Sequence, residues 1–165
     1  MILRLSKILL VAGIAFFHTL IVFNNATDYS SNFQYVQHVL AMDTTFRGNH
    51  GMWRAIHSQR MIYLFYDGII VWEMVTTVLC WIGVVCMSRA WRKSIREFSQ
   101  AKRFALIALT LSLLLWLVAF LAVGGEWFLM WQSALWNGQN AAARMFLVVG
   151  VVFLLLAMPD TETQP

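Results

Sequence analysis

The stretch MIYLFYDGIIVWEMVTTVLCWIGVVCMS, residues 61–88, decides the fold class, because it is long and almost entirely apolar. A helix needs about 20 apolar residues, each rising about 1.5 Å, to cross roughly 30 Å of hydrocarbon. Three further runs meet this requirement, at about 5–24, 104–123 and 142–158, and Pro159 ends the last of them. We therefore expect an all-α membrane protein, a bundle of four transmembrane helices.

The overall composition supports a membrane location. The 165 residues are 60% hydrophobic and 12% charged, whereas a soluble domain carries about 25% charged residues. Cys80 and Cys86 fall in one apolar run, so no disulfide framework is implied. Arg4 and Lys7 lie at the start of the first apolar run as in a signal peptide, but no A-x-A pattern follows, and we expect an uncleaved span. Repeats and Pro- or Gly-rich linkers are missing from the sequence, which predicts a single domain, 1–165.

The basic residues predict the orientation of the chain. Eight of the twelve lysines and arginines lie at the N-terminal start of the first span or in the connection 89–103: Arg4, Lys7, Arg89, Arg92, Lys93, Arg96, Lys102 and Arg103. By the positive-inside rule, both termini are cytoplasmic, and loops 25–60 and 124–141 form an outer, periplasmic cap. We expect the inner loop 89–103 to lie against anionic lipid headgroups and not to bind nucleic acid.

The first outer loop is expected to be partly helical. Tyr29, Phe33, Val36 and Leu40 recur at three- and four-residue spacing, which is typical of one face of an amphipathic helix. Asp28 or Ser30 is a suitable N-cap for it. Such a helix either lies on the bilayer surface or folds over the bundle, and the sequence leaves both arrangements open.

The second outer loop, GGEWFLMWQSALWNGQ at 124–139, combines aromatic and polar residues. Tryptophans at this depth are typical of the aromatic belt at a membrane interface. The polar residues between them suggest a recessed polar site as the alternative. The cluster comprises Glu126, Trp127, Trp131, Gln132, Trp136, Asn137 and Gln139, and the candidates in the first loop are Asn25, Asp28, His38, Asp43, Trp53 and Arg54.

Three of these outer stretches also carry a family resemblance. NNATDYSSNFQYVQHVLAMDTTF, MWRAI and GGEWFLMWQSALWNGQ are similar to the signature stretches of a bacterial family of predicted small integral membrane proteins, domain of unknown function 2165. The resemblance covers nearly the whole chain. It implies four spans and an inner-membrane location, and it implies no reaction.

Four ionisable residues fall within or near the spans: His18, Asp67, Glu73 and Arg144. Each is costly in hydrocarbon and is expected to have a partner. Asp67 and Glu73 are about 240° apart on a helix, so we expect separate contacts: Asp67 with Arg144 or His18, and Glu73 with Ser112 or Trp116. These groups act either as polar links between helices or as a proton or ion relay.

The sequence gives little support for a metal, haem or catalytic site. His38, Asp43, His50 and His57 are weak metal candidates, because the spacings of twelve and seven between the histidines match no compact ligand motif. Only His18 lies clearly within a span, whereas haem between helices usually needs two axial ligands. The sequence has no nucleophile elbow and no phosphate-binding glycine loop. We expect a non-catalytic protein without a cofactor but with bound lipid.

The function that we expect is that of a structural or accessory subunit in the bacterial inner membrane. It either self-associates or joins a larger membrane complex through its aromatic and polar periplasmic face. One alternative is an oligomeric channel or transporter that uses Glu73 or His18. Another is a membrane protein that binds a lipid, a quinone or a metal.

Overall fold

The computed structural model describes residues 1–160, and in that range the chain is helical with no β-strand. Four segments are long and apolar enough to cross a membrane: α1 (Ile2–Thr27), α3 (Gln59–Ala90), the continuous run Ile95–Trp127, and α6 (Gln139–Ala157). The prediction of an all-α chain with four spans is confirmed.

The remaining helices are shorter or subdivide these spans. The third span comprises α4 (Ile95–Ala101), α5 (Arg103–Leu114) and the π-helix η2 (Leu115–Trp127). Between the first and second spans lie α2 (Tyr29–Ala41) and the 3₁₀ turn η1 (Met52–Arg54), and a second 3₁₀ turn, η3 (Met130–Gln132), follows η2.

The connection predicted at 89–103 is shorter in the structure, because residues 95–101 form α4. The cause is local: the Ser94 hydroxyl accepts a hydrogen bond from the Glu97 backbone N–H at 3.3 Å, and the Glu97 carboxylate accepts from the Ser94 N–H at 3.2 Å. This capping box starts a helix at a polar sequence. The S-x-x-E spacing of this capping box is present in the sequence at 94–97, but hydrophobicity alone does not indicate the helix, because the segment is polar.

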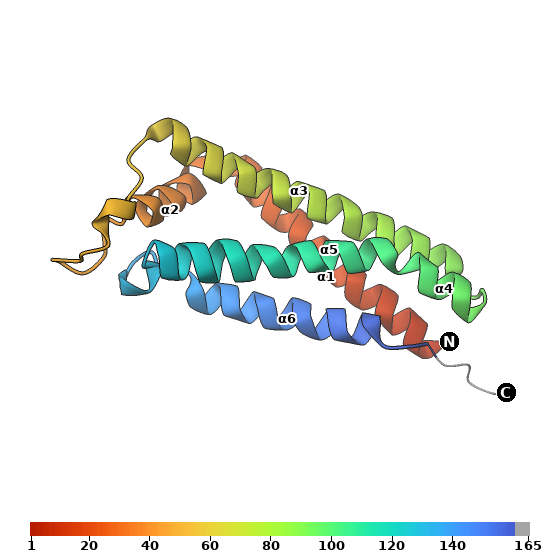
Figure 1. The fold of residues 1–165 in the computed structure, drawn as a ribbon. Coiled ribbons are helices and arrows are strands. Elements are labelled where there is room, and N and C mark those ends of the chain that lie inside the picture. Colours follow the sequence, from red (N-terminus) through yellow and green to blue (C-terminus); the bar gives the residue numbers. More distant parts are fainter. Residues whose placement is uncertain (161–165) are drawn as a thin grey trace.

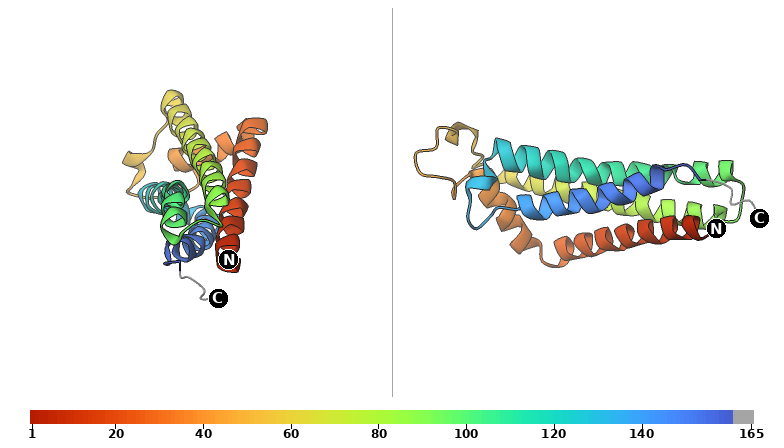
Figure 2. Two further views of the ribbon diagram at one scale, coloured as in Figure 1. Left: turned by 90° about the vertical axis from the view of Figure 1, so that its right-hand side faces the viewer. Right: turned by 90° about the horizontal axis from the view of Figure 1, so that it is seen from below.

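The four long helices lie side by side, with the core between them (Figures 1 and 2). α3 packs against α1 and α5, and α6 packs against α5 and η2. Val11, Cys80, Ala108 and Val149, one from each spanning helix, are completely buried in this core. Small residues such as Ala108 allow close approach, as is common between membrane helices.

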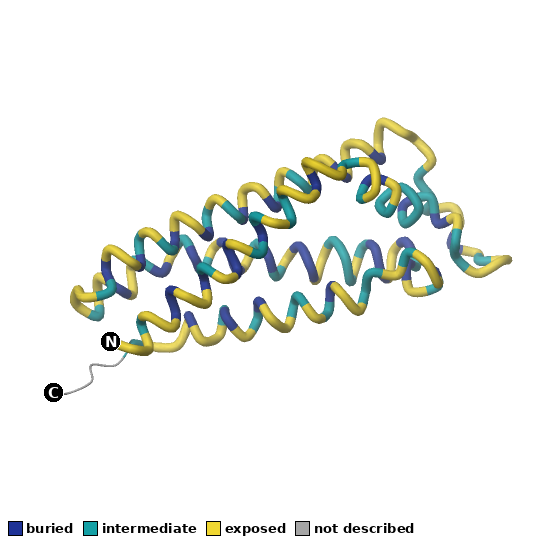
Figure 3. Tube along the Cα trace, turned by 180° about the vertical axis from the view of Figure 1, so that it is seen from behind, coloured by how far each residue is buried: buried dark blue, intermediate teal, exposed yellow. Residues whose placement is uncertain are grey.

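The outer surface of the bundle is apolar. Figure 3 shows buried and exposed positions alternating along each helix, with the exposed positions directed outward. Leu9, Leu64 and Leu154 are 61%, 65% and 66% exposed. Apolar side chains exposed to this extent over the length of a bundle are stable in hydrocarbon and costly in water.

The two ends of the bundle differ, and we name them by their contents. The terminal end carries the start of α1, α4 and residues 158–160, and the loop end carries α2 and residues 42–58 and 128–138 (Figure 1). At the loop end, α2 packs on the bundle: Phe33 and Leu40 are buried in a cluster with Ile62 and Tyr66. This decides between the two predicted positions of that helix. The start of α1 and the end of α6 lie at one end, and the side of the membrane that this end faces remains a prediction.

Candidate functional site

Within the bundle, the side chain of Glu73 is bound between two helices. The Glu73 carboxylate accepts a hydrogen bond from Asn25 Nδ2 at 2.6 Å, and Asn25 Oδ1 accepts one from the Tyr66 hydroxyl at 3.2 Å. All three side chains are buried, and they join α1 to α3. The expected partners Ser112 and Trp116 are not those of Glu73. The sequence places Asn25 in an outer loop, whereas α1 extends to Thr27 and brings it into the bundle.

His18 forms a second, separate polar link. His18 Nε2 and Ser112 Oγ are 2.8 Å apart, both residues are completely buried, and the contact joins α1 to α5. Nearby on the third span, Leu111 accepts a hydrogen bond at its carbonyl oxygen from Trp72 Nε1 at 3.1 Å. His18 and Glu73 therefore each have a partner of their own, an arrangement that fixes helix packing.

Asp67 and Arg144 are exposed and make no ion pair within residues 1–160. Asp67 instead accepts a hydrogen bond from the Tyr29 hydroxyl of α2 at 2.7 Å. Burial and this hydrogen bond to Asp67 raise the pKa of Tyr29 to about 12, so the hydroxyl keeps its proton and donates. The predicted pairing of Asp67 with Arg144 or His18 is wrong, because Tyr29 reaches Asp67 from α2 and His18 is bonded to Ser112 on α5.

The two loops at the loop end are joined by hydrogen bonds centred on Gln132. Its Oε1 accepts from the Phe46 backbone N–H at 3.1 Å and from Asn49 Nδ2 at 3.3 Å. The Thr44 hydroxyl donates to Ser133 Oγ at 2.7 Å, and Arg54 Nη1 donates to the Trp127 carbonyl oxygen at 3.0 Å.

The predicted polar cluster at 124–139 does not converge on one recess. Glu126 and Asn137 are exposed, and the Asn137 side chain accepts from the Gln139 N–H at 3.1 Å at the start of α6. Gln139 itself lies against Gly125, where an added Cβ would come within 2.5 Å of its Nε2. The cluster therefore divides into separate loop and helix contacts.

The aromatic residues of the loop end pair with one another and with cations. Trp53 and Trp127 meet edge to face with ring centroids 5.7 Å apart, and the Arg54 guanidinium lies over both rings, at 5.4 and 5.1 Å. The His38 ring stacks on Trp136 at 4.6 Å.

The histidine candidates for a metal do not come together. His38 Nδ1 lies 2.7 Å from Asp43 Oδ2. Within residues 1–160, no group of three or more His, Cys, Asp or Glu side chains is placed to hold a metal ion. Asp28 stands at the N-cap of α2, but its side chain forms no capping hydrogen bond.

Beneath α2 lies an apolar cavity of about 510 Å³, which the sequence did not reveal. α2, α3 and η2 form its walls, and Phe128 and Met130 complete it. The lining comprises Tyr35, Val36, Val39, Leu40, Met61, Leu64, Phe65, Gly68, Ile69, Trp72, Val118, Ala119, Phe120, Val123, Gly124, Phe128 and Met130. The α3 members recur as an ordinary helical stripe, so their spacing alone does not distinguish a cavity wall from a lipid-facing or core surface.

The polar side-chain atoms of this lining already have partners. The Tyr35 hydroxyl donates to Met130 Sδ at 2.9 Å, and Trp72 Nε1 donates to the Leu111 carbonyl oxygen. Burial raises the pKa of Tyr35 to about 12, although a backbone hydrogen bond with Gly138 opposes the rise, so the hydroxyl stays protonated. The cavity therefore presents an apolar wall.

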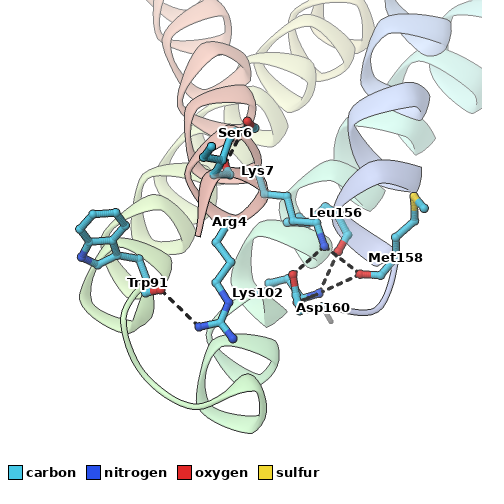
Figure 4. Close-up of polar contacts among 9 residues, drawn as sticks. Arg4, Ser6, Lys7, Trp91, Lys102, Leu156, Met158 and Asp160 are labelled. Atoms are coloured by element: carbon cyan, nitrogen blue, oxygen red, sulfur yellow. Dashed lines mark hydrogen bonds and ion pairs between the residues drawn. The ribbon is translucent and has the colours of Figure 1, made fainter. Parts of the chain in front are cut away.

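At the terminal end, one carboxylate holds two buried lysines (Figure 4). Asp160 Oδ1 lies 2.8 Å from Lys7 Nζ, and Oδ2 lies 2.7 Å from Lys102 Nζ. The same ammonium groups donate to the carbonyl oxygens of Leu156 and Met158 at the end of α6. We call these residues the terminal clasp, because they join α1 and the α4–α5 junction to the chain that follows α6.

Comparison with known proteins identifies the family and nothing narrower. No curated protein and no solved structure matches the chain. The family model described as predicted small integral membrane protein (DUF2165) matches residues 3–159. The match extends over all four spanning helices and both loop regions of the loop end. The chain therefore belongs to this family of small integral membrane proteins.

Proposed function

We propose that the protein is a non-catalytic membrane protein that holds the acyl chain of a membrane lipid in the apolar cavity between α2, α3 and η2. The observation that carries this proposal is the cavity itself, whose volume of about 510 Å³ falls in the usual range for ligand pockets. Its walls offer apolar surface and no unbonded polar side chain for a ligand to contact.

The position of the cavity supports a lipid chain as its occupant. Four lining residues, Met61, Leu64, Phe65 and Val118, are 38–65% exposed on the side of the bundle. A void lined by apolar groups loses dispersion contacts when it is empty, and lipid tails are the apolar groups at hand in a bilayer. A quinone is a poorer fit, because its carbonyl oxygens need donors that are already engaged here.

Two glycines shape this space. A Cβ added at Gly68 would meet no atom within 4 Å, so the cavity opens at this position of α3. At Gly124, an added Cβ would lie 3.3 Å from the Ala119 carbonyl oxygen. η2 is π-helical, a form that is rare and is often found at functional sites.

The test fills the cavity from Gly68. The full chain is reconstituted with a phospholipid whose acyl chain carries a photoactivatable group, and the labelled residues are identified by mass spectrometry. We expect labels on α2, α3 and η2 in the native protein, and a loss of roughly fivefold or more with Gly68→Leu, because the new side chain occupies the site. Gly13→Leu is the matched control, since Gly13 also has open space around its Cβ position but lies on α1, away from the cavity. Equal labelling of Gly68→Leu and Gly13→Leu would reject the proposal.

A second candidate function, association through the loop end, rests on a separate observation. The two loops are hydrogen-bonded to each other, yet the aromatic Trp53 and Phe46 are 73% and 59% exposed, and the apolar Leu135 is 80% exposed. Exposed aromatic side chains on an ordered surface are typical of interface cores. This supports an accessory or self-associating subunit. The basic residues of the terminal end favour a cytoplasmic location for that end, and so a periplasmic location for the loop end, in a bacterial inner membrane.

Native mass spectrometry of the protein extracted from its membrane tests this second candidate. A multiple of 19.0 kDa indicates self-association, and extra mass from another polypeptide indicates an accessory subunit. A monomer alone would reject both. A channel that uses Glu73 or His18 has less support, because each residue is bonded to a different partner and neither lines the cavity.

A further inference from the structure

A second hollow, at the terminal end of the bundle, has a different character from the apolar cavity. It has a volume of about 790 Å³ and lies between the last turns of α3 and the α4–α5 region. Its rim carries three cations, Arg89, Lys93 and Arg103, and one carboxylate, Glu97. We call it the basic pocket.

The rim has an excess of positive charge that the protein does not neutralise within residues 1–160. Glu97 is occupied by the Ser94 hydroxyl at 2.8 Å and by Lys93 at 3.5 Å. No carboxylate in the described chain lies within 4.0 Å of the Arg89 or Arg103 guanidinium group. Two planar, forked donor groups therefore remain for an anion, and phosphate oxygens match this geometry.

The floor of the basic pocket is apolar. Ala90 is 6% exposed, and Phe104 is half-buried with the Arg103 guanidinium 4.7 Å above its ring. The floor continues onto α3 and α5, which belong to helices long and apolar enough to cross a membrane, so an acyl chain that starts on the floor has apolar helix surface to follow. Positive charge above an apolar floor suits an amphipathic anion better than a free one.

The walls of the pocket are fixed by contacts outside it. Arg4 Nη1 donates to the Trp91 carbonyl oxygen at 3.3 Å (Figure 4). It also donates to the Lys93 carbonyl oxygen at 2.6 Å, and the two bonds hold the turn between α3 and α4. Further along the bundle, a Cβ on Gly83 would lie 2.7 Å from the Ala105 backbone nitrogen, so α3 and α5 are in direct contact there. The pocket is therefore preformed, as ligand sites usually are.

We propose that the basic pocket binds the phosphate-bearing head group of an anionic phospholipid, with Arg89 and Arg103 on the phosphate and the acyl chain against Phe104. This site is separate from the apolar cavity in position and in chemistry, since it selects for head-group charge and the cavity does not.

The experiment compares two pairs of arginines from the same segment. Binding of phosphatidylglycerol and of phosphatidylcholine to the full chain in detergent is titrated by native mass spectrometry. Arg89→Gln with Arg103→Gln removes the pocket cations, and Arg92→Gln with Arg96→Gln removes the same charge from residues outside the pocket. We expect the first pair to weaken phosphatidylglycerol binding by about tenfold or more and the second by less than about threefold.

Three results would overturn the proposal: equal weakening by both pairs, phosphatidylcholine bound as tightly as phosphatidylglycerol, or displacement of the lipid by millimolar inorganic phosphate. The first indicates a diffuse charged surface, and the last indicates a site for the free anion.

A measurement on the unaltered chain covers the case in which the pocket variants do not fold. Cys86 lines the pocket and is partly exposed, whereas Cys80 is completely buried. Phosphatidylglycerol in phosphatidylcholine vesicles is expected to slow maleimide labelling of Cys86 by roughly fivefold, because the bound lipid covers the thiol. An unchanged labelling rate would contradict binding at this place.

Discussion

Replacement of Asp160 by asparagine tests whether the terminal clasp stabilises the bundle. Asp160 is 2% exposed at its side chain, and its two oxygens face two ammonium groups at 2.8 and 2.7 Å. Asp160→Asn removes the negative charge but keeps the shape, so both buried lysines lose their counter-ion. Lys7 and Lys102 are themselves only 3% and 4% exposed, and water does not compensate for the loss.

The magnitude follows from the geometry. At these distances each pair attracts by about 6 kcal/mol at an effective dielectric constant of about 20. Removal of the ions from water and the repulsion between the two lysines offset much of this attraction. Removal of one partner from a buried ion pair costs about 3–5 kcal/mol in measured cases. We expect Asp160→Asn to lower the free energy of unfolding by about 3 kcal/mol. This is the lower end of that range, because the carbonyl oxygens of Leu156 and Met158 still accept hydrogen bonds from the lysines.

The clasp also predicts a dependence on pH. Burial acts to raise the pKa of Asp160, but the hydrogen bonds and charges of Lys102 and Lys7 outweigh it and hold the pKa below its ordinary value of 3.8. A lowered pKa in the folded state means that the stabilisation is complete above the ordinary value and is lost as the pH falls through the lowered one. The difference in stability between the native chain and Asp160→Asn is therefore constant near neutral pH and shrinks below about pH 4.

The assay is reversible unfolding in mixed micelles, followed by circular dichroism at several pH values. Glu97→Gln is the control, because the pair of Glu97 with Lys93 is exposed at 3.5 Å and contributes little, and glutamine can keep the capping box of α4. A loss of less than about 1 kcal/mol for Asp160→Asn at neutral pH would refute the reasoning, since a buried pair would then behave as an exposed one.

Two further substitutions test the other polar contacts. Glu73→Leu is expected to lower the free energy of unfolding by about 1–2 kcal/mol, because it leaves the Asn25 amide without its acceptor. Glu73→Gln is expected to retain most of the stability of the native chain. The same unfolding assay checks this, and an unchanged free energy of unfolding for Glu73→Leu would contradict it. Gln132→Ala should accelerate proteolysis within 42–58 by roughly fivefold, because about 1 kcal/mol of hydrogen bonding between the loops is lost. The exposed Glu126 serves as control, and equal effects of Glu126→Ala and Gln132→Ala would argue against this role for Gln132.

Several features of the fold were predictable because their causes are local. Apolar runs long enough to cross a membrane identified the four spans, and the spacing of Tyr29, Phe33, Val36 and Leu40 identified α2. The predicted ends of the spans were too short, because hydrophobicity marks the hydrocarbon region and the helices continue into polar residues. α1 continues to Thr27, and this alone moves Asn25 from a loop into a buried contact.

The partners of the polar residues were not predictable from the sequence. Glu73 was expected to meet Ser112 or Trp116, but its partner Asn25 lies 48 positions away on another helix. Asp67 was expected to meet Arg144 or His18, but Tyr29 reaches it from α2. Such pairings depend on how far each helix extends, how it is rotated and what covers it, and periodicity within one helix contains none of this information.

The sequence by itself determined that the protein is an all-α membrane protein. Each segment that crosses hydrocarbon must bury its own backbone hydrogen bonds and carry apolar side chains, so each span can be recognised separately. The tertiary structure alone decided where space and charge remain between the segments. The apolar cavity exists because α2 covers a gap between α3 and η2, and the terminal clasp exists because Asp160 returns to lysines 153 and 58 positions earlier. Both result from distant segments meeting in space, which is a property of the packed chain and not of any single stretch.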